Sequence, residues 1–105
     1  MKKLFKITAE IEVAKENGRT LPIQTGYRPG FNFIDQKQTS GSIDLLDRAD
    51  LKPGDKSIVE ISFVSNELLG EIMVGTVFKF FEGPIEIGSG KVIHVMGWVK
   101  NPNWE

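Results

Sequence analysis

The sequence predicts an all-β domain, a small antiparallel barrel or sandwich of six strands. Apolar and polar side chains alternate along residues 4–14, 57–65 and 71–81, which is the period of a half-buried strand. Residues that favour turns separate these stretches at intervals of about 8–12 residues, a spacing typical of sandwiches and barrels. No stretch carries a sustained helical period. Closure into a barrel would remove the exposed strand edges that favour aggregation.

The first predicted strand is the clearest. Its apolar side chains fall at every second position and define one face: Phe5, Ile7, Ala9, Ile11 and Val13. The chain turns after it at Asn17-Gly18. Residues 19–29 contain two prolines and few apolar side chains. We expect them to form a long, ordered loop, because its ends lead directly into strands.

The middle of the chain contains two short strands and a strong turn. A second strand begins at residues 31–34, and the polar residues 35–38 are expected to form a bulge or loop. A third strand covers residues 43–46, and residues 47–50 would form one helical turn at most. Residues 52–55 read Lys-Pro-Gly-Asp, and proline followed by glycine fits the two central positions of a type II turn.

Three more strands are expected in the second half, over residues 57–65, 71–81 and 86–95. The connection between the first two carries Leu68 and Leu69, which we expect to plug one end of a barrel. Two glycines in the last strand, Gly88 and Gly90, indicate a close backbone approach or a sharp bend.

The C-terminal residues 97–105 contain Trp98 and Trp104. We expect a short extension after a domain of residues 1–96, with at least Trp98 packing back on the barrel.

Composition limits the function. The chain has 105 residues, enough for one domain with one core, and 13 basic against 14 acidic residues. This balance gives no strong electrostatic field that would attract nucleic acid or an acidic membrane. There are no cysteines, so disulfides, thiolate metal sites and cysteine nucleophiles are excluded. No apolar run approaches the ~18 residues of a membrane span. We expect a cytoplasmic protein.

The sequence offers little for catalysis. His94 is the only histidine and lies in an apolar strand, where a packed or surface role is commoner than a catalytic one. The run Gly88-Ser89-Gly90-Lys91 lacks the spacing of a phosphate-binding loop. Asp44, Asp47 and Asp50 are more typical of a solvated turn than of an acid–base pair. We therefore expect no enzyme activity, no cofactor and no metal site.

Residues 26–33 are the most informative stretch. Gly26 and Pro29 make a rigid turn, and Tyr27 and Arg28 stand within it. One interpretation is a structural corner with a half-buried tyrosine ring. The other is an exposed aromatic and cationic anchor at an interface, where both residue types are enriched. With Arg19 and Thr20, these residues could form a patch for RNA backbone or for a protein.

A second candidate contact site lies near the turn Glu82-Gly83-Pro84. Phe78 and Phe80 precede it on one face of the predicted strand, and Phe81 must point to the opposite face unless a bulge intervenes. An outward phenylalanine would mark a contact site. A covering C-terminal segment is the alternative.

These motifs resemble the C-terminal β-barrel, the third domain, of elongation factor Tu. The resemblance covers roughly residues 5–95, and the order and spacing of its landmarks make it specific. The landmarks are Gly18-Arg19-Thr20-Leu21-Pro22, Gly26-Tyr27-Arg28-Pro29-Gly30-Phe31-Asn32-Phe33, Thr39-Ser40-Gly41, Lys52-Pro53-Gly54-Asp55, Glu82-Gly83 and Gly88-Ser89-Gly90. The resemblance implies a six-stranded Greek-key barrel. In the family this barrel contacts the T-arm of aminoacyl-tRNA, the GTP-binding domain and the exchange factor.

This chain departs from the family at those contact positions. Thr20 stands where the family has histidine, and Phe81 and Ile85 stand where it has arginines. Gly30 replaces a glutamine and Ser89 an alanine. Loss of cations that face phosphates weakens RNA affinity. Met1 falls where the third domain would start, so we expect a stand-alone barrel without the GTP-binding domain.

The expected function is therefore a non-enzymatic protein-binding module that mimics the third domain of elongation factor Tu. A decoy or immunity-type partner of a toxin that docks on the factor is one concrete version. The expected partner-binding residues are Arg19, Thr20, Tyr27, Arg28, Phe81, Glu82, Gly83 and Ile85. The alternative is a tRNA- or RNA-binding accessory of translation that uses Arg19, Arg28, Ser40 and Gly41. A third possibility is a barrel whose partner is a second copy of itself.

Overall fold

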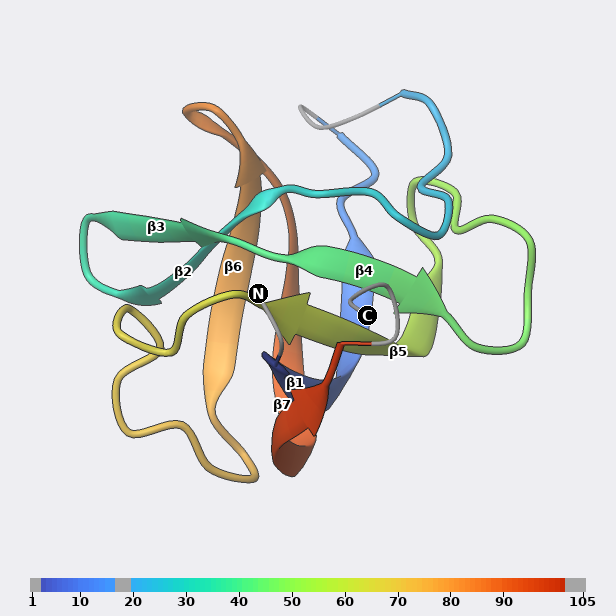
Figure 1. Ribbon diagram of the computed structural model, residues 1–105. Helices are drawn as coiled ribbons and strands as arrows, with labels where there is room; N and C mark the ends of the chain where they lie inside the picture. The colour runs from blue at the N-terminus through green and yellow to red at the C-terminus, as the bar shows by residue number, and fades with distance from the viewer. Residues whose placement is uncertain (1–2, 17–19, 102–105) are drawn as a thin grey trace.

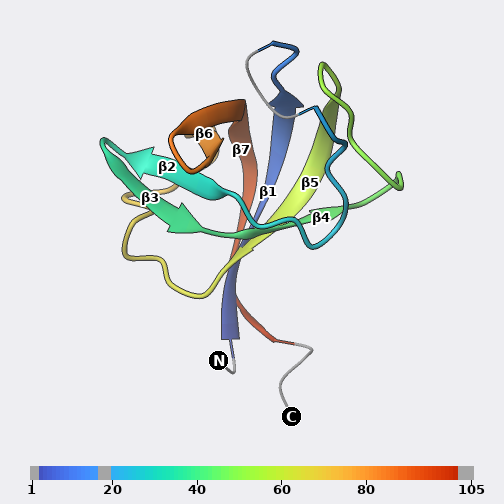
Figure 2. The same ribbon diagram turned by 90° about the horizontal axis from the view of Figure 1, so that it is seen from above.

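The computed structural model describes residues 3–16 and 20–101. Within them the chain forms one antiparallel sheet that curls into a barrel (Figures 1 and 2). Its strands are β1 (Lys3–Val13), β2 (Gly30–Ile34), β3 (Lys37–Ser40), β4 (Ser42–Leu45), β5 (Lys56–Phe63), β6 (Val77–Glu82) and β7 (Ile85–Lys100). Their spatial order is β3-β2-β6-β7-β1-β5-β4. The described residues include no helix that is long and apolar enough to cross a membrane.

The two edge strands, β3 and β4, are consecutive in the chain and separated only by Gly41. β3 pairs with β2, and β4 pairs with β5. The same chain segment therefore joins both edges of the sheet. Two hydrogen bonds complete the closure: the Gly41 N–H donates to the Pro29 carbonyl at 3.3 Å, and the Ile43 N–H donates to the Tyr27 carbonyl at 2.9 Å.

This segment explains why seven strands are observed where six were predicted. Residues 35–38 were predicted as a bulge or loop, but the turn is confined to Asp35-Gln36 and β3 begins at Lys37. β3 lacks the apolar alternation that would reveal it. If β3 and β4 are counted as one strand interrupted at Gly41, the barrel has six strands. Gly41 is required there, because an added Cβ would lie 2.7 Å from Phe63 Cε1.

The apolar face of β1 lies in the core, as its alternation predicted. Phe31 of β2 is the centre of an aromatic cluster and is fully buried. Its ring centroid lies 5.4 Å from that of Phe63, 5.8 Å from Phe78 and 5.9 Å from Phe80. Phenylalanine rings from different strands thus pack together within a core that is otherwise aliphatic.

The two glycines of β7 provide the room for this cluster. Gly88 is paired with Phe80 and Gly90 with Phe78 across β6 and β7. A Cβ on Gly88 would lie 2.3 Å from Phe80 Cζ, and one on Gly90 would lie 2.5 Å from Phe78 Cζ. The predicted close approach is confirmed, and the approaching groups are aromatic rings as well as backbone.

Two predicted boundaries differ from the structure. The strand expected over 71–81 begins only at Val77, because the preceding residues turn at Val74-Gly75, where Gly75 has φ 96° and donates its N–H to the Val92 carbonyl at 2.8 Å. β7 runs on to Lys100, beyond residue 96, where the barrel domain was expected to end. There the Trp98 ring packs edge-on against Phe5, with centroids 5.5 Å apart.

Of the remaining local predictions, some are confirmed, one is not, and two fall outside the described residues. The turn at residues 52–55 is confirmed: Gly54 has φ 89°, and the Asp55 N–H donates to the Lys52 carbonyl at 2.9 Å. Leu69 is buried, as expected of a plug. The optional helical turn at residues 47–50 does not form. The predicted turn at Asn17-Gly18 and the packing of Trp104 fall outside the described residues.

Candidate partner-binding surfaces

Two hydrogen bonds bring together residues from three separate parts of the chain at one end of the barrel. The Tyr27 hydroxyl, from the loop before β2, donates to Glu82 Oε1 at 2.5 Å. The side-chain amide of Gln38, on β3, donates to the Gly83 carbonyl at 3.2 Å. We call Tyr27, Gln38, Glu82 and Gly83 the Tyr27 cluster. It fixes the β6–β7 hairpin to the segment that closes the barrel.

The Tyr27 ring is half-buried and packs against the core, so this residue has the position of a structural corner. Its backbone forms an isolated bridge with Ile43 of β4. The hydroxyl alone extends to the surface, where it meets Glu82. The ring therefore supports the rim of the barrel and positions an acidic side chain on it.

The hairpin next to the Tyr27 cluster exposes an apolar side chain. Ile85 is 52% exposed and is paired with Glu82 across the hairpin. Gly83, with φ 58°, forms the turn between them. Phe81 is half-buried, and the register shift between Phe80 and Phe81 is the bulge that allows this. Ile85 is thus the outward apolar residue here, and Phe81 is only partly available to a partner.

Arg28 lies on a different surface from Tyr27, although the two are adjacent in the sequence. Its exposed side chain lines a hollow of about 270 Å³ with Leu4, Lys6, Ser42, Asp44, Ser62, Val64 and Asn101. The predicted single patch around Tyr27 and Arg28 is therefore divided between two places. The cause is the extended backbone, in which successive side chains point to opposite faces.

The other predicted site residues are scattered. Thr20 is exposed in the long loop, and Ser40 is exposed at the end of β3. Gly41 is buried between aromatic rings and presents no side chain to RNA. Arg19 lies outside the described residues.

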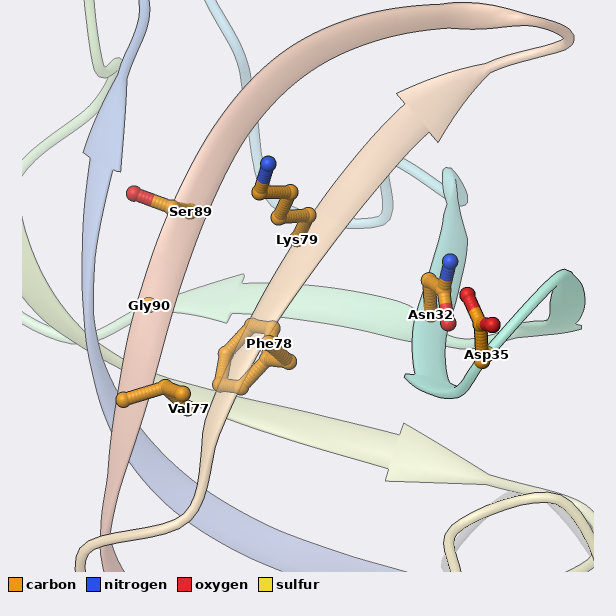
Figure 3. Close-up of a pocket in the computed structure, with 7 residues that line it drawn as sticks. All are labelled: Asn32, Asp35, Val77, Phe78, Lys79, Ser89 and Gly90. Carbon is orange, nitrogen blue, oxygen red and sulfur yellow. The ribbon is translucent and has the colours of Figure 1, made fainter.

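A second hollow was not predicted from the sequence. It has a volume of about 480 Å³ and is lined by Asn32, Asp35, Val77, Phe78, Lys79, Ser89 and Gly90. Figure 3 shows Lys79 and Ser89 on the neighbouring strands β6 and β7, with Asn32 and Asp35 across from them. Lys79 Nζ lies 3.3 Å from Glu86 Oε1. In the sequence, the small residues around Ser89, which stand between residues with longer side chains, could have indicated a hollow here.

This hollow does not assemble a catalytic group. Its ionisable side chains are one ammonium and one carboxylate, and its single hydroxyl belongs to Ser89. Among the described residues, no three histidine, cysteine, aspartate or glutamate side chains are grouped to hold a metal ion.

Similarity to known proteins agrees with the barrel fold. No protein-family model matches the chain. Elongation factor Tu 2 of Streptomyces avermitilis is 36% identical to it over 91 residues, which is 87% of this chain and 22% of that protein. The chain is a homologue of one part of elongation factor Tu. Its fold agrees with the C-terminal β-barrel of the factor, as the sequence motifs indicated. The chain spans only about a fifth of this relative's length.

Proposed function

We propose that this chain is a non-enzymatic protein-binding module that mimics the C-terminal barrel of elongation factor Tu. Its partner would be a protein that recognises the factor through that barrel. The observation that carries the proposal is Ile85, an exposed apolar side chain at a hairpin where the resembling family carries an arginine.

The setting of Ile85 supports this assignment. The Tyr27–Glu82 and Gln38–Gly83 hydrogen bonds hold the hairpin at two points to the neighbouring segment that closes the barrel. A restrained hairpin loses little conformational entropy when it binds, which favours affinity. An aliphatic side chain beside a half-buried Phe81 and a carboxylate also resembles the apolar centre and polar rim of a protein interface more than a phosphate-binding surface.

A decoy or immunity-type role is the specific form that we propose. A chain that keeps the barrel of the factor and alters its rim would compete for a protein, such as a toxin, that docks on the factor. The balanced net charge of −1 favours a protein over tRNA as the partner.

Competitive capture tests the proposal. The full chain is immobilised and exposed to cytosol, with and without an excess of the C-terminal barrel of elongation factor Tu. We expect at least one protein to be retained and then displaced by that barrel. Ile85→Arg should weaken its retention at least about tenfold, because burying an isoleucine contributes about 1.5–3 kcal/mol.

Val77→Arg is the matched control, because Val77 is 70% exposed and lies at the far end of β6. It should leave retention unchanged. Equal retention by the Ile85→Arg and wild-type chains would refute the role of the hairpin. A wild-type gel shift with tRNA that weakens as salt rises would instead favour the RNA-binding alternative.

A further inference from the structure

The hollow beside Arg28 has a floor of two serines between two long cationic side chains. Ser62 of β5 is opposite Ser42 of β4 on one side and Lys6 of β1 on the other. The bridge between Tyr27 and Ile43 and the bond from Gly41 to Pro29 place Arg28 opposite Ser42. Arg28, Ser42, Ser62 and Lys6 thus form one row across the barrel surface. The surface is hollow at the middle of this row, where the two serines have short side chains.

Ser62 indicates that this hollow can hold a ligand. Its residue is only 7% exposed, and it is the buried polar residue of the described core. Ser62 lines the hollow, and its hydroxyl has no hydrogen-bond partner among the residues that the structure describes. A ligand atom placed in the hollow can therefore form a hydrogen bond with this hydroxyl.

The two cationic side chains beside the serines differ, because one is already in an ion pair and the other is not. Lys6 Nζ lies 3.5 Å from Glu60 Oε1, so its charge is already balanced. Arg28 forms no ion pair within the described part of the chain. Asp44 lies at the same end of the hollow as Glu60, and Leu4 and Val64 close the other end. A guanidinium beside two hydroxyls is suited to hold a planar carboxylate in two hydrogen bonds.

We propose that the Arg28 hollow binds one carboxylate side chain, an aspartate or glutamate, of the protein partner. This inference rests on the proposed protein-binding function and specifies the chemistry of the partner. The size agrees, because about 270 Å³ is below the roughly 300–1,000 Å³ of pockets for drug-sized ligands. A carboxylate is favoured over a phosphate, because Asp44, which lines the hollow, would repel a dianion more strongly than a monoanion.

The test is an NMR titration of the full chain with two capped tripeptides, Gly-Glu-Gly and Gly-Gln-Gly, at constant ionic strength. The signals to follow are the Arg28 side-chain N–H and the Ser62 backbone amide. We expect the glutamate peptide to shift both signals in a saturable way and the glutamine peptide to leave them unchanged. Arg28→Gln should weaken binding at least about tenfold, and Ser62→Ala about fivefold.

Lys52→Gln removes one positive charge, as Arg28→Gln does. It serves as the control, because Lys52 is exposed on the turn before β5 and outside the hollow. It should bind the glutamate peptide like the wild type. Equal responses to both peptides, a response that survives Arg28→Gln, or stronger binding of inorganic phosphate would each overturn the proposal. The titration needs no partner, so its result is independent of the capture experiment on Ile85.

Discussion

The interior of the barrel and the end that carries the Tyr27 cluster are built in opposite ways. In the interior, Phe80 lies so close to Gly88 that no Cβ fits between them. At the end, two side-chain hydrogen bonds join exposed groups, and Ile85 next to them projects into solvent. The interior depends on the shape of each residue, and the end depends on a few polar contacts.

This difference shows where the chain can change without losing its fold. Substitution of a packed ring removes buried contacts and leaves a cavity. Substitution of an exposed side chain usually changes stability by less than about 0.5 kcal/mol. A chain that keeps the interior can therefore acquire new surface residues at the hairpin. The similarity to elongation factor Tu over 87% of the chain, with an isoleucine at position 85 of the rim, agrees with this separation.

The largest effect should come from Phe31→Ala. Phe31 is fully buried and contacts the rings of Phe33, Phe63, Phe78 and Phe80. We expect the free energy of unfolding to fall by about 3–5 kcal/mol, because the cavity would open at the centre of the barrel. Urea denaturation followed by tryptophan fluorescence measures the change. Val77→Ala, at an exposed position, should change it by less than about 0.5 kcal/mol.

A loss below about 1 kcal/mol for Phe31→Ala would contradict the comparison. It would mean that the surrounding rings collapse into the space, and that the interior is as tolerant as the rim.

Gly88→Ala should have the next largest effect. The added Cβ would lie 2.3 Å from Phe80 Cζ and 2.5 Å from the Glu12 carbonyl oxygen. Because one of these atoms belongs to the backbone, rotation of a side chain cannot relieve the clash. We expect a loss of about 2–3 kcal/mol in the free energy of unfolding, typical of overpacking.

Gly75→Ala is the matched control for that prediction. No atom lies within 4 Å of a Cβ at Gly75, whose φ is 96°. Its cost of about 1–2 kcal/mol would come from the left-handed backbone alone. Adding Phe80→Leu should recover part of the loss in Gly88→Ala, and strict additivity of the two changes would argue against the ring contact.

The sequence predicts the interior better than the rim, and the structure gives the reason. The buried face of β1 and the close approach at Gly88 and Gly90 depend on local patterns of spacing and size. β3 carries no such pattern, because it is a polar edge segment that pairs with β2 across the Asp35-Gln36 turn.

The candidate sites depend on contacts between distant segments. Tyr27 and Glu82 are 55 positions apart and meet only in the folded chain. The separation of Arg28 from Tyr27, and the serine floor beneath it, also require the register of β4, β5 and β1. Residue types alone therefore predicted one candidate contact surface at residues 27 and 28, but not that the two side chains lie in separate places.

The smallest effect should come from Tyr27→Phe, which removes the hydroxyl bound to Glu82 Oε1 and keeps the half-buried ring. We expect a loss of about 1 kcal/mol or less in the free energy of unfolding, the usual net value of one hydrogen bond. Partner retention should fall less than with Ile85→Arg, because Gln38 still holds the hairpin at Gly83. A double-mutant cycle with Glu82→Ala separates this bond from the other contacts of the two residues. A coupling of about 0.5–1 kcal/mol would confirm that the bond restrains the hairpin. If the two substitutions are additive, the Tyr27 ring supports the rim and the hydrogen bond to Glu82 does not.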